Sequence, residues 1–209
     1  MDTLGLVERC QHGDPEAFRE LFRAHRQDVT RLALRMLGRS SDLEDIVQEV
    51  FLQVHRSLRE FRHGARFSTW LYRVTVNVVL MHRRAAKSRP VFGDAPDGLP
   101  AVDQKPFADE QLDRHRRVDA FHRLLDRLSE KKRVVFVLHE LEGLPPGEIA
   151  QIVGSPVLTV RTRLFYARRE LLALLTQEPA LAALAAELGA DAATDGPPPS
   201  SDDTAKEPA

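Results

Sequence analysis

Apolar residues recur every three or four positions along most of this chain, and this spacing is the feature that most restricts its fold. Residues at such intervals share one side of an α-helix, whereas strands require alternation at every second position. The period is most regular between residues 43 and 54, where one face would carry Leu43, Ile46, Val47, Val50, Phe51 and Val54. Extended alternation is rare, so the sequence predicts an all-α protein.

Short local signals mark several helix ends. Asp14 followed by Pro15 is typical of a helix start, because the carboxylate caps free amides and proline fits the first turn. Ser41 and Glu44 have the spacing of a capping box, which predicts that both side chains bond to backbone amides there. Another helix is predicted to begin near residue 68 or 69, with a buried side formed by Phe67, Leu71, Val74 and Val78.

The helical period stops between residues 88 and 110, a segment with four prolines and two glycines. This composition predicts a flexible linker between two small helical domains, at 1–87 and 111–176. Residues 177–209 are rich in alanine and then in proline, serine and acids. They hold too few large apolar groups to offset the entropy of ordering, so this acidic tail is predicted to be largely disordered.

In the second domain the pattern predicts helices at 112–128, 129–141, 146–153 and 156–175. The last two flank Gly154, and a short helix, a glycine turn and a longer basic helix form a helix-turn-helix. Ser155 and Pro156 are predicted as the cap and first turn of the long helix. Spacings of four, three and four predict its buried stripe, which consists of Val160, Leu164, Ala167 and Leu171.

The opposite face of the long helix suits the major groove of duplex DNA. Arginine can bridge guanine acceptors there, a hydroxyl can pair either way, and an aromatic edge can meet a thymine methyl group. A solvated basic helix is the plainer alternative. The residues predicted to contact duplex DNA are Thr159, Arg161, Thr162, Arg163, Phe165, Tyr166 and Arg169.

Aromatic and basic residues are interleaved near the end of the first domain. Between residues 56 and 89 there are nine lysines and arginines against one acid, Glu60. Unpaired nucleic acid needs flat groups for stacking and cations for phosphates, and both occur here. The alternative for Trp70, the sole tryptophan, is that it only fills the core. The candidate contacts are Arg66, Phe67, Ser68, Thr69, Trp70, Arg73, Asn77, Arg83 and Arg84.

Acidic residues occupy the outer face of the helix predicted after residue 42. Asp42, Asp45 and Glu49 follow one another at spacings of three and four, so they share one side of the helix. Like charges side by side are unfavourable, and this arrangement indicates a basic partner surface. An ordinary acidic solvent face is the alternative for this motif taken alone.

The three segments, in this order and separation, resemble the extracytoplasmic-function (ECF) group of the sigma-70 family. Residues 42–51 resemble the helix that docks on core RNA polymerase, which implies contacts from Asp42, Asp45, Gln48 and Glu49. Residues 66–77 resemble the region that opens and reads the minus-10 element, which implies that residues 62–69 receive a base flipped out of the duplex. Residues 128–172 resemble the region that reads the minus-35 element.

The resemblance implies three partners: core RNA polymerase, promoter DNA and a restraining anti-sigma factor. Promoter DNA would be single-stranded at the minus-10 element and duplex at the minus-35 element. The sequence departs from the family pattern at Met81, Pro145, Leu158 and Tyr166. The change at Tyr166 affects the expected DNA sequence preference rather than the mode of binding.

Other classes of protein fit less well. The sequence has no phosphate-binding glycine loop, nucleophile elbow or zinc-binding His-Glu-x-x-His motif, so we predict no catalytic residue, metal or other cofactor. No apolar run is long enough to span a bilayer, and Cys10 is the one cysteine, so we expect a cytoplasmic protein without membrane insertion. The main alternative is a sigma mimic that binds an anti-sigma factor without engaging DNA. A free-standing repressor would leave the acidic helix unexplained.

Overall fold

The computed structural model describes residues 3–38, 40–62, 64–88, 108–177 and 181. Every regular element in these ranges is helical, as predicted. The chain divides into two compact units, one up to His122 and one from Arg123 onward. The predicted linker and tail lie mostly outside the described residues, and the predicted domain limits stay predictions. In chain order the elements are α1 (Thr3–Gln11), α2 (Pro15–Leu37), α3 (Leu43–Ser57), η1 (Leu58–Glu60), α4 (Phe67–Ser88), α5 (Ala108–Arg127), α6 (Glu130–Phe136), η2 (Val137–Leu141), α7 (Pro146–Val153) and α8 (Val157–Leu175).

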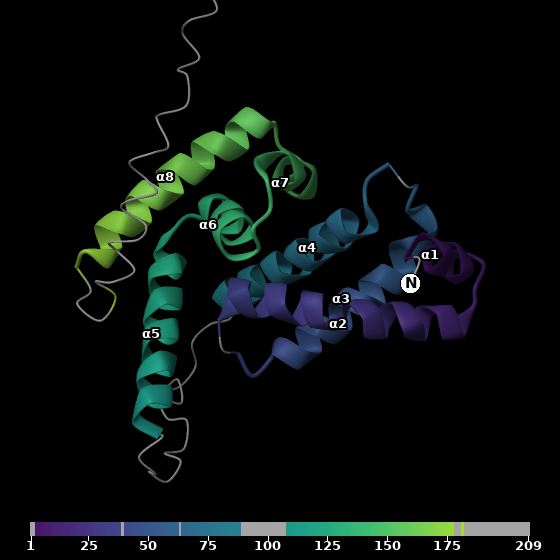
Figure 1. The fold of residues 1–209 in the computed structure, drawn as a ribbon, viewed down its shortest axis with the longest axis horizontal. Coiled ribbons are helices and arrows are strands. Elements are labelled where there is room, and N and C mark those ends of the chain that lie inside the picture. Colours follow the sequence, from purple (N-terminus) through teal and green to yellow (C-terminus); the bar gives the residue numbers. More distant parts are fainter. Residues whose placement is uncertain (1–2, 39, 63, 89–107, 178–180, 182–209) are drawn as a thin grey trace, which may run out of the picture. The chain divides into compact units, whose positions relative to one another are not determined.

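The first unit is built around α2, which packs against α1, α3 and α4 (Figure 1). α3 also packs against α4. The predicted apolar stripe of α3 is buried from Ile46 to Val54, whereas Leu43 is half-buried. The predicted buried side of α4 is confirmed, and this helix begins at Phe67, just before the predicted start.

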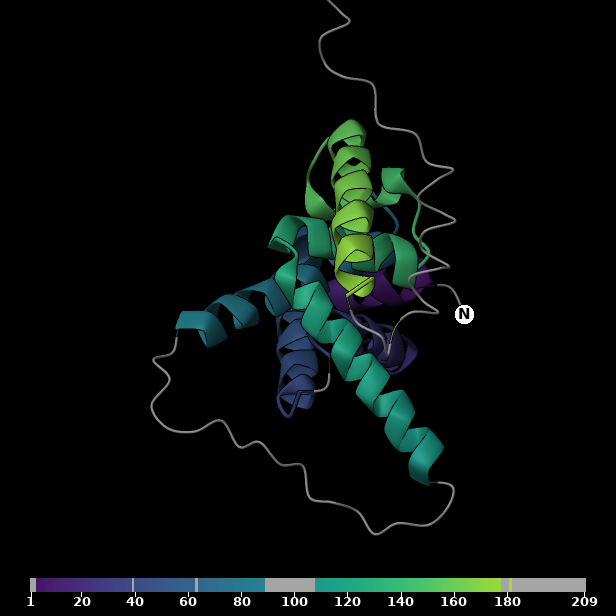
Figure 2. The same ribbon diagram turned by 90° about the vertical axis from the view of Figure 1, so that its left-hand side faces the viewer.

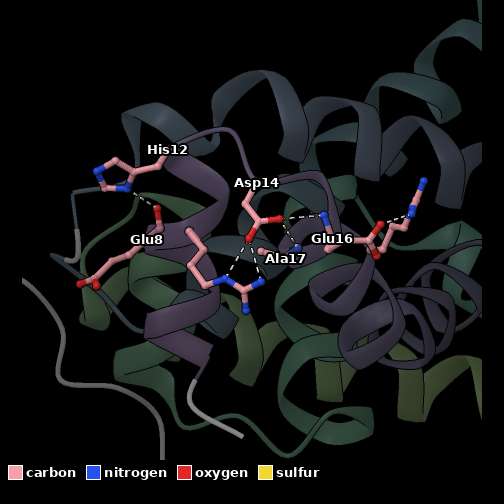
Figure 3. A network of polar contacts seen from close by, with 7 residues as sticks. Glu8, His12, Asp14, Glu16 and Ala17 are labelled. Carbon is pink, nitrogen blue, oxygen red and sulfur yellow. Dashed lines mark hydrogen bonds and ion pairs between the residues drawn. The ribbon is translucent and has the colours of Figure 1, made fainter.

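The start of α2 has the predicted cap. Asp14 Oδ1 accepts hydrogen bonds from the amides of Glu16 (2.9 Å) and Ala17 (3.2 Å), and Oδ2 accepts from the Arg9 guanidinium at 2.7 and 2.9 Å (Figure 3). The Arg9 bond, followed by the amide bonds, lowers the pKa of the Asp14 carboxyl. This single side chain therefore joins the end of α1 to the start of α2.

The predicted capping box at the start of α3 is wrong. No side chain caps the first-turn amides of this helix. The Ser41 hydroxyl donates to the Asp42 carboxylate at 3.0 Å, and the Asp42 amide donates to the Ser40 hydroxyl at 3.2 Å. Glu44 accepts from Arg26 of α2 at 3.0 Å. A tertiary ion pair thus takes the carboxylate that the capping box requires.

In the second unit, α6 and α7 both pack against α8, the long light-green helix (Figures 1 and 2). The helix predicted at 129–141 is α-helical only to Phe136, and its hydrogen bonds then widen to a π pattern over η2. The bounds of α7 match the prediction, and Gly154 forms the left-handed turn at φ 61°. α8 begins at Val157 without a side-chain cap, because the Ser155 hydroxyl instead accepts from Arg163 at 3.1 Å.

Two ion pairs join α8 to η2 and α6. Arg168 donates to Glu140 of η2 at 2.7 Å, and both side chains are mostly buried. Lys132 of α6 donates to Glu170 at 2.5 Å. Arg168 and Glu170 flank the apolar stripe of α8 on its two edges, so these bonds help to fix which face of the helix points outward.

Candidate nucleic-acid interface

The aromatic residues of α4 form a supported cluster. Trp70 is half-buried and lies against the rings of Phe61 and Phe67, with centroid separations of 5.4 and 5.6 Å. Phe61 and Phe67 are themselves in the core, at 5% and 4% exposure. One side of the indole therefore packs on the core, while another part remains exposed to solvent. Trp70 does more than fill the core.

Two basic or polar residues continue the Trp70 side of α4. Arg73 and Asn77 follow at spacings of three and four, and both are exposed. Farther along, Arg84 is exposed, whereas Arg83 is half-buried and donates to the Met36 carbonyl at 3.5 Å. The helix thus presents an aromatic group, a cation and an amide along one outer strip.

The residues at the start of α4 are divided between surface and core. Arg66 and Ser68 are exposed, but Phe67 and Thr69 are only 4% and 5% exposed. A direct DNA contact by either buried side chain would require it to leave its packing. Phe67 instead supports Trp70, so its observed place is beneath the predicted interface rather than on it.

A cavity of about 410 Å³ lies beside this segment. Its walls come from α1, α2 and the start of α4: Thr3, Leu4, His25, Ala65, Arg66, Phe67 and Ser68. The contributions of α1 and α2 were missed from the sequence, because no local motif links residues so far apart along the chain. The cavity is in the same first unit as the cluster around Trp70.

The wall of this cavity includes a histidine, His25. Its ring lies 5.1 Å from that of Phe67, and its Nε2 is buried without a hydrogen-bond partner among the described residues. Burial lowers the pKa of His25, and Asp28, 3.9 Å away, only partly opposes this effect. The imidazole is therefore neutral near pH 7.

The predicted buried stripe of α8 is confirmed, so the opposite side of this helix faces outward. Val160, Leu164, Ala167 and Leu171 are all in the core, as predicted. Among the predicted duplex contacts, three are exposed and the others half-buried; the exposed ones are Arg161, Tyr166 and Arg169, and the half-buried ones are Thr159, Thr162, Arg163 and Phe165.

Local bonds already occupy part of this face. The Thr162 hydroxyl donates to the Leu158 carbonyl at 3.0 Å. The rings of Phe165 and Tyr166 meet edge to face, with centroids 5.4 Å apart. Leu158 was not among the predicted contacts, yet it is 49% exposed at the leading end of the helix.

The acidic face of α3 is paired within the protein. Asp42 lies 3.3 Å from His82, and Glu49 lies 4.0 Å from Arg56. Asp45 is exposed at the centre of the face, and Gln48 is exposed beside it. The sequence interpretation foresaw the shared side of these acids but not their intramolecular partners, which come from other helices or from the far end of α3.

An apolar groove adjoins the acids. Leu52 is 50% exposed, one turn after Gln48. Together with residues of α2 it borders a hollow of about 430 Å³ lined by Phe18, Phe22, Gln48, Phe51, Leu52 and His55. The candidate docking face therefore combines carboxylates with an exposed leucine and an aromatic hollow, a mixture found at protein interfaces.

The described part of the chain shows neither a metal-binding cluster nor a membrane-spanning helix. Its histidines, cysteine and acids form no group of three or more that could hold a metal ion. None of its helices is long and apolar enough to cross a bilayer.

A helix-turn-helix in one unit, and an aromatic and basic helix beside an acidic one in the other, define a helical DNA-binding protein of the transcription machinery. Family comparison agrees in both units: the Sigma-70 region 2 model matches residues 21–89, and the Sigma-70 region 4 model matches residues 119–171. The chain belongs to the sigma-70 family and is an RNA polymerase sigma factor of the ECF group.

Relatives and solved structures support the same assignment. The ECF sigma-E factor of Escherichia coli is 37% identical over 172 residues, which cover 78% of this chain and 88% of the relative. The sigma-H factor of Pseudomonas aeruginosa is 32% identical over 170 residues, with the same coverage. The structure of CnrH in complex with the cytosolic domain of CnrY matches with a TM-score of 0.61 and 25% identity, covering 85% of this chain and 98% of that chain.

Proposed function

We propose that the first unit docks on core RNA polymerase and captures the unpaired minus-10 strand, while the second unit reads the duplex minus-35 element. The protein would act in the cytoplasm and perform no covalent chemistry. The free energy for melting would come from base capture and polymerase contacts, because unstacking a base step costs about a few kcal/mol. A bound regulatory protein, an anti-sigma factor, would restrain it.

The observation that carries the minus-10 proposal is the strip of Trp70, Arg73 and Asn77 on the same unit as a 410 Å³ cavity. Stacking of a base on an aromatic side chain contributes about 1–3 kcal/mol. The packing of Trp70 against Phe61 and Phe67 holds the indole in place before DNA arrives, which reduces the entropy lost on binding.

We assign the cavity as the place for a flipped base. Arg66 and Ser68 in its wall supply a cation and a hydroxyl, and Phe67 supplies an apolar surface. His25 also lines the cavity and, being neutral, adds no positive charge to it. A base offers a flat face and a polar edge, and flipped bases are held by stacking together with hydrogen bonds to that edge.

The docking proposal rests on α3. Asp45 and Leu52 are both exposed on its outer side, and Gln48 lies between them along the helix. A polymerase segment with basic residues and one apolar side chain would fit this surface, since it could pair the carboxylates and fill the groove beside Phe22. Asp42 and Glu49 would exchange their present partners for those of polymerase.

The proposal of a restraining partner is supported by one relative of known structure. CnrH, which shares the fold of this chain over most of its length, was solved with the cytosolic domain of CnrY bound to it. A protein bound to the acidic face of α3 or to the outer face of α8 would block polymerase or DNA.

The test is transcription from a randomised promoter library with purified core polymerase. We expect transcripts only when the protein is added, and their sequences would reveal both promoter elements. A Trp70→Ala, Asn77→Ala variant should lose these transcripts. Glu8→Ala is the control, because Glu8 is exposed on α1, outside α4 and outside the residues that line the cavity, so its loss should leave transcription unchanged.

The same purified proteins also distinguish a sigma factor from a sigma mimic. A mimic would bind neither core polymerase nor promoter DNA, and it would leave the library silent. Failure to bind core polymerase in a size-exclusion or fluorescence assay would therefore overturn the proposed function.

A further inference from the structure

The leading turn of α8 carries an exposed apolar side chain. Leu158 is 49% exposed, in the first turn of a helix that begins at Val157. Most leucines of this unit are in the core, including Leu164 and Leu171 of the same helix. In a helix-turn-helix the residues nearest the N-terminus of the second helix are those that contact base edges.

Leu158 points in the same direction as the predicted DNA contacts. It precedes Thr162 by four positions and Arg169 by eleven, so the three lie along one side of the helix at 100° per residue. The buried residues Val160 and Leu164 lie on the opposite side. A helix placed in the groove with Arg169 facing DNA therefore also presents Leu158.

The side chain one turn after Leu158 on this side of the helix has its hydrogen-bond donor already in use. The Thr162 hydroxyl already donates its proton to the Leu158 carbonyl, 3.0 Å away. Tyr166, one turn farther, is 49% exposed and presents an aromatic ring. Among the groups on base edges in the major groove, the methyl group of thymine is the apolar one, whereas guanine and adenine offer acceptors that leucine cannot pair.

We propose that Leu158 contacts the methyl group of a thymine and so selects thymine at one position of the duplex element. This inference rests on the proposed function, because it requires α8 to enter the major groove. It adds a specificity-determining residue outside the predicted set and names the chemical group that this residue reads.

The experiment uses deoxyuridine, which differs from thymidine only by the missing methyl group. The upstream element is first selected from a duplex library with the full-length protein bound to core polymerase. Each thymine of the selected element is then replaced singly by deoxyuridine, and affinity is measured by competition. We expect one position at which the replacement weakens binding by about fourfold, the equivalent of about 0.8 kcal/mol for one buried methyl group.

Leu158→Ala should bind the thymine and deoxyuridine duplexes at that position with equal affinity. Val157→Ala is the matched control, because Val157 is 40% exposed in the same turn but points about 100° away, and this variant should keep the fourfold preference. Both positions are exposed, so neither change should unfold the helix, which circular dichroism would verify.

Two results would overturn the inference, and they can be told apart. If Leu158→Ala keeps the preference, or if no thymine is methyl-sensitive in the native protein, Leu158 does not read a methyl group although the duplex is still bound. If the native complex binds no duplex in the library selectively, the proposed minus-35 function fails as well.

Discussion

At the scale of single residues, Trp70 shows how a side chain can be both structural and functional. Sequence patterning could place it beside cations but could not show how it packs, because Phe61 and Phe67 approach it from different turns of the chain. The prediction for Phe67 and Thr69 was made from proximity in sequence, and the structure buries both. Both residues lie in the first turn of α4, where successive side chains point in different directions, so proximity along the chain is a weak guide to exposure.

Replacing Trp70 by alanine should reduce promoter opening by about 5- to 150-fold, the equivalent of about 1–3 kcal/mol for one stacked base. Trp70→Phe should retain most of the opening, because a smaller ring still stacks and still packs on Phe61. Permanganate reactivity of thymines in the minus-10 region measures the opening directly. Equal opening by the native protein and the alanine variant would refute a stacking role.

His25 should make the first unit less stable in mild acid. Its folded pKa is lowered by burial, so the unfolded chain takes up a proton first as the pH falls below the ordinary value of 6.5. The neutral imidazole therefore makes its full contribution to the free energy of unfolding above pH 6.5. This contribution is lost as the pH falls from 6.5 toward the pKa of His25 in the folded protein.

His25→Gln removes this titration and should lose less unfolding free energy between pH 7 and pH 5 than the native chain. Urea denaturation at the two pH values measures the difference. His12→Gln is the control, since His12 is exposed and its Nδ1 bonds only to the Glu8 carbonyl within its own helix end (Figure 3). The same acid loss in the native protein and in His25→Gln would contradict the assignment.

At the scale of elements, the period of apolar residues gave reliable predictions where one face of a helix meets a core. The stripes of α3, α4 and α8 are nearly as predicted, and so are the bounds of α7. The failures are at helix ends. Glu44 pairs with Arg26 of α2, and Ser155 pairs with Arg163 two turns into the helix that it was expected to cap. Capping motifs span only a few residues, so they do not show these competing partners. The π turn at η2 likewise depends on how the chain packs.

Two adjacent arginines of α8 should have different roles: Arg168 should stabilise the fold, and Arg169 should bind DNA. Arg168 is mostly buried and paired with Glu140, so Arg168→Leu should lower the free energy of unfolding by about 1–3 kcal/mol, because a carboxylate is left without its partner. Arg169 is exposed on the outer face, so Arg169→Ala should leave stability unchanged but weaken duplex binding.

Salt titrations distinguish the two arginines further. Loss of one phosphate contact at Arg169 should reduce the log–log slope of affinity against salt by about 0.9. The folded Arg168→Leu protein should keep the native slope, since its guanidinium is directed toward Glu140. A reduced slope in both variants would show that Arg168 also reaches DNA.

At the scale of the whole molecule, the proposed function assigns polymerase docking and duplex reading to different units. The acidic face of α3 is in the first unit and the outer face of α8 in the second. Asp45→Lys should therefore abolish binding to core polymerase while leaving duplex binding by α8 intact. Glu8→Lys makes the same charge change at an exposed acid of α1 and should retain polymerase binding. Loss of both activities in Asp45→Lys alone would indicate that the two surfaces are coupled.

The internal pairing of the α3 acids affects how strongly polymerase binding depends on salt concentration, compared with promoter binding. Glu44 and Glu49 have arginine partners within the protein, and Asp42 lies against His82. In the proposed docking, polymerase would exchange these bonds for its own, so we expect the net release of bound ions to be small. Contacts between exposed arginines and phosphates release many ions. As ionic strength rises, we expect the protein to leave promoters well before it leaves polymerase, so that the holoenzyme survives conditions in which it no longer holds DNA.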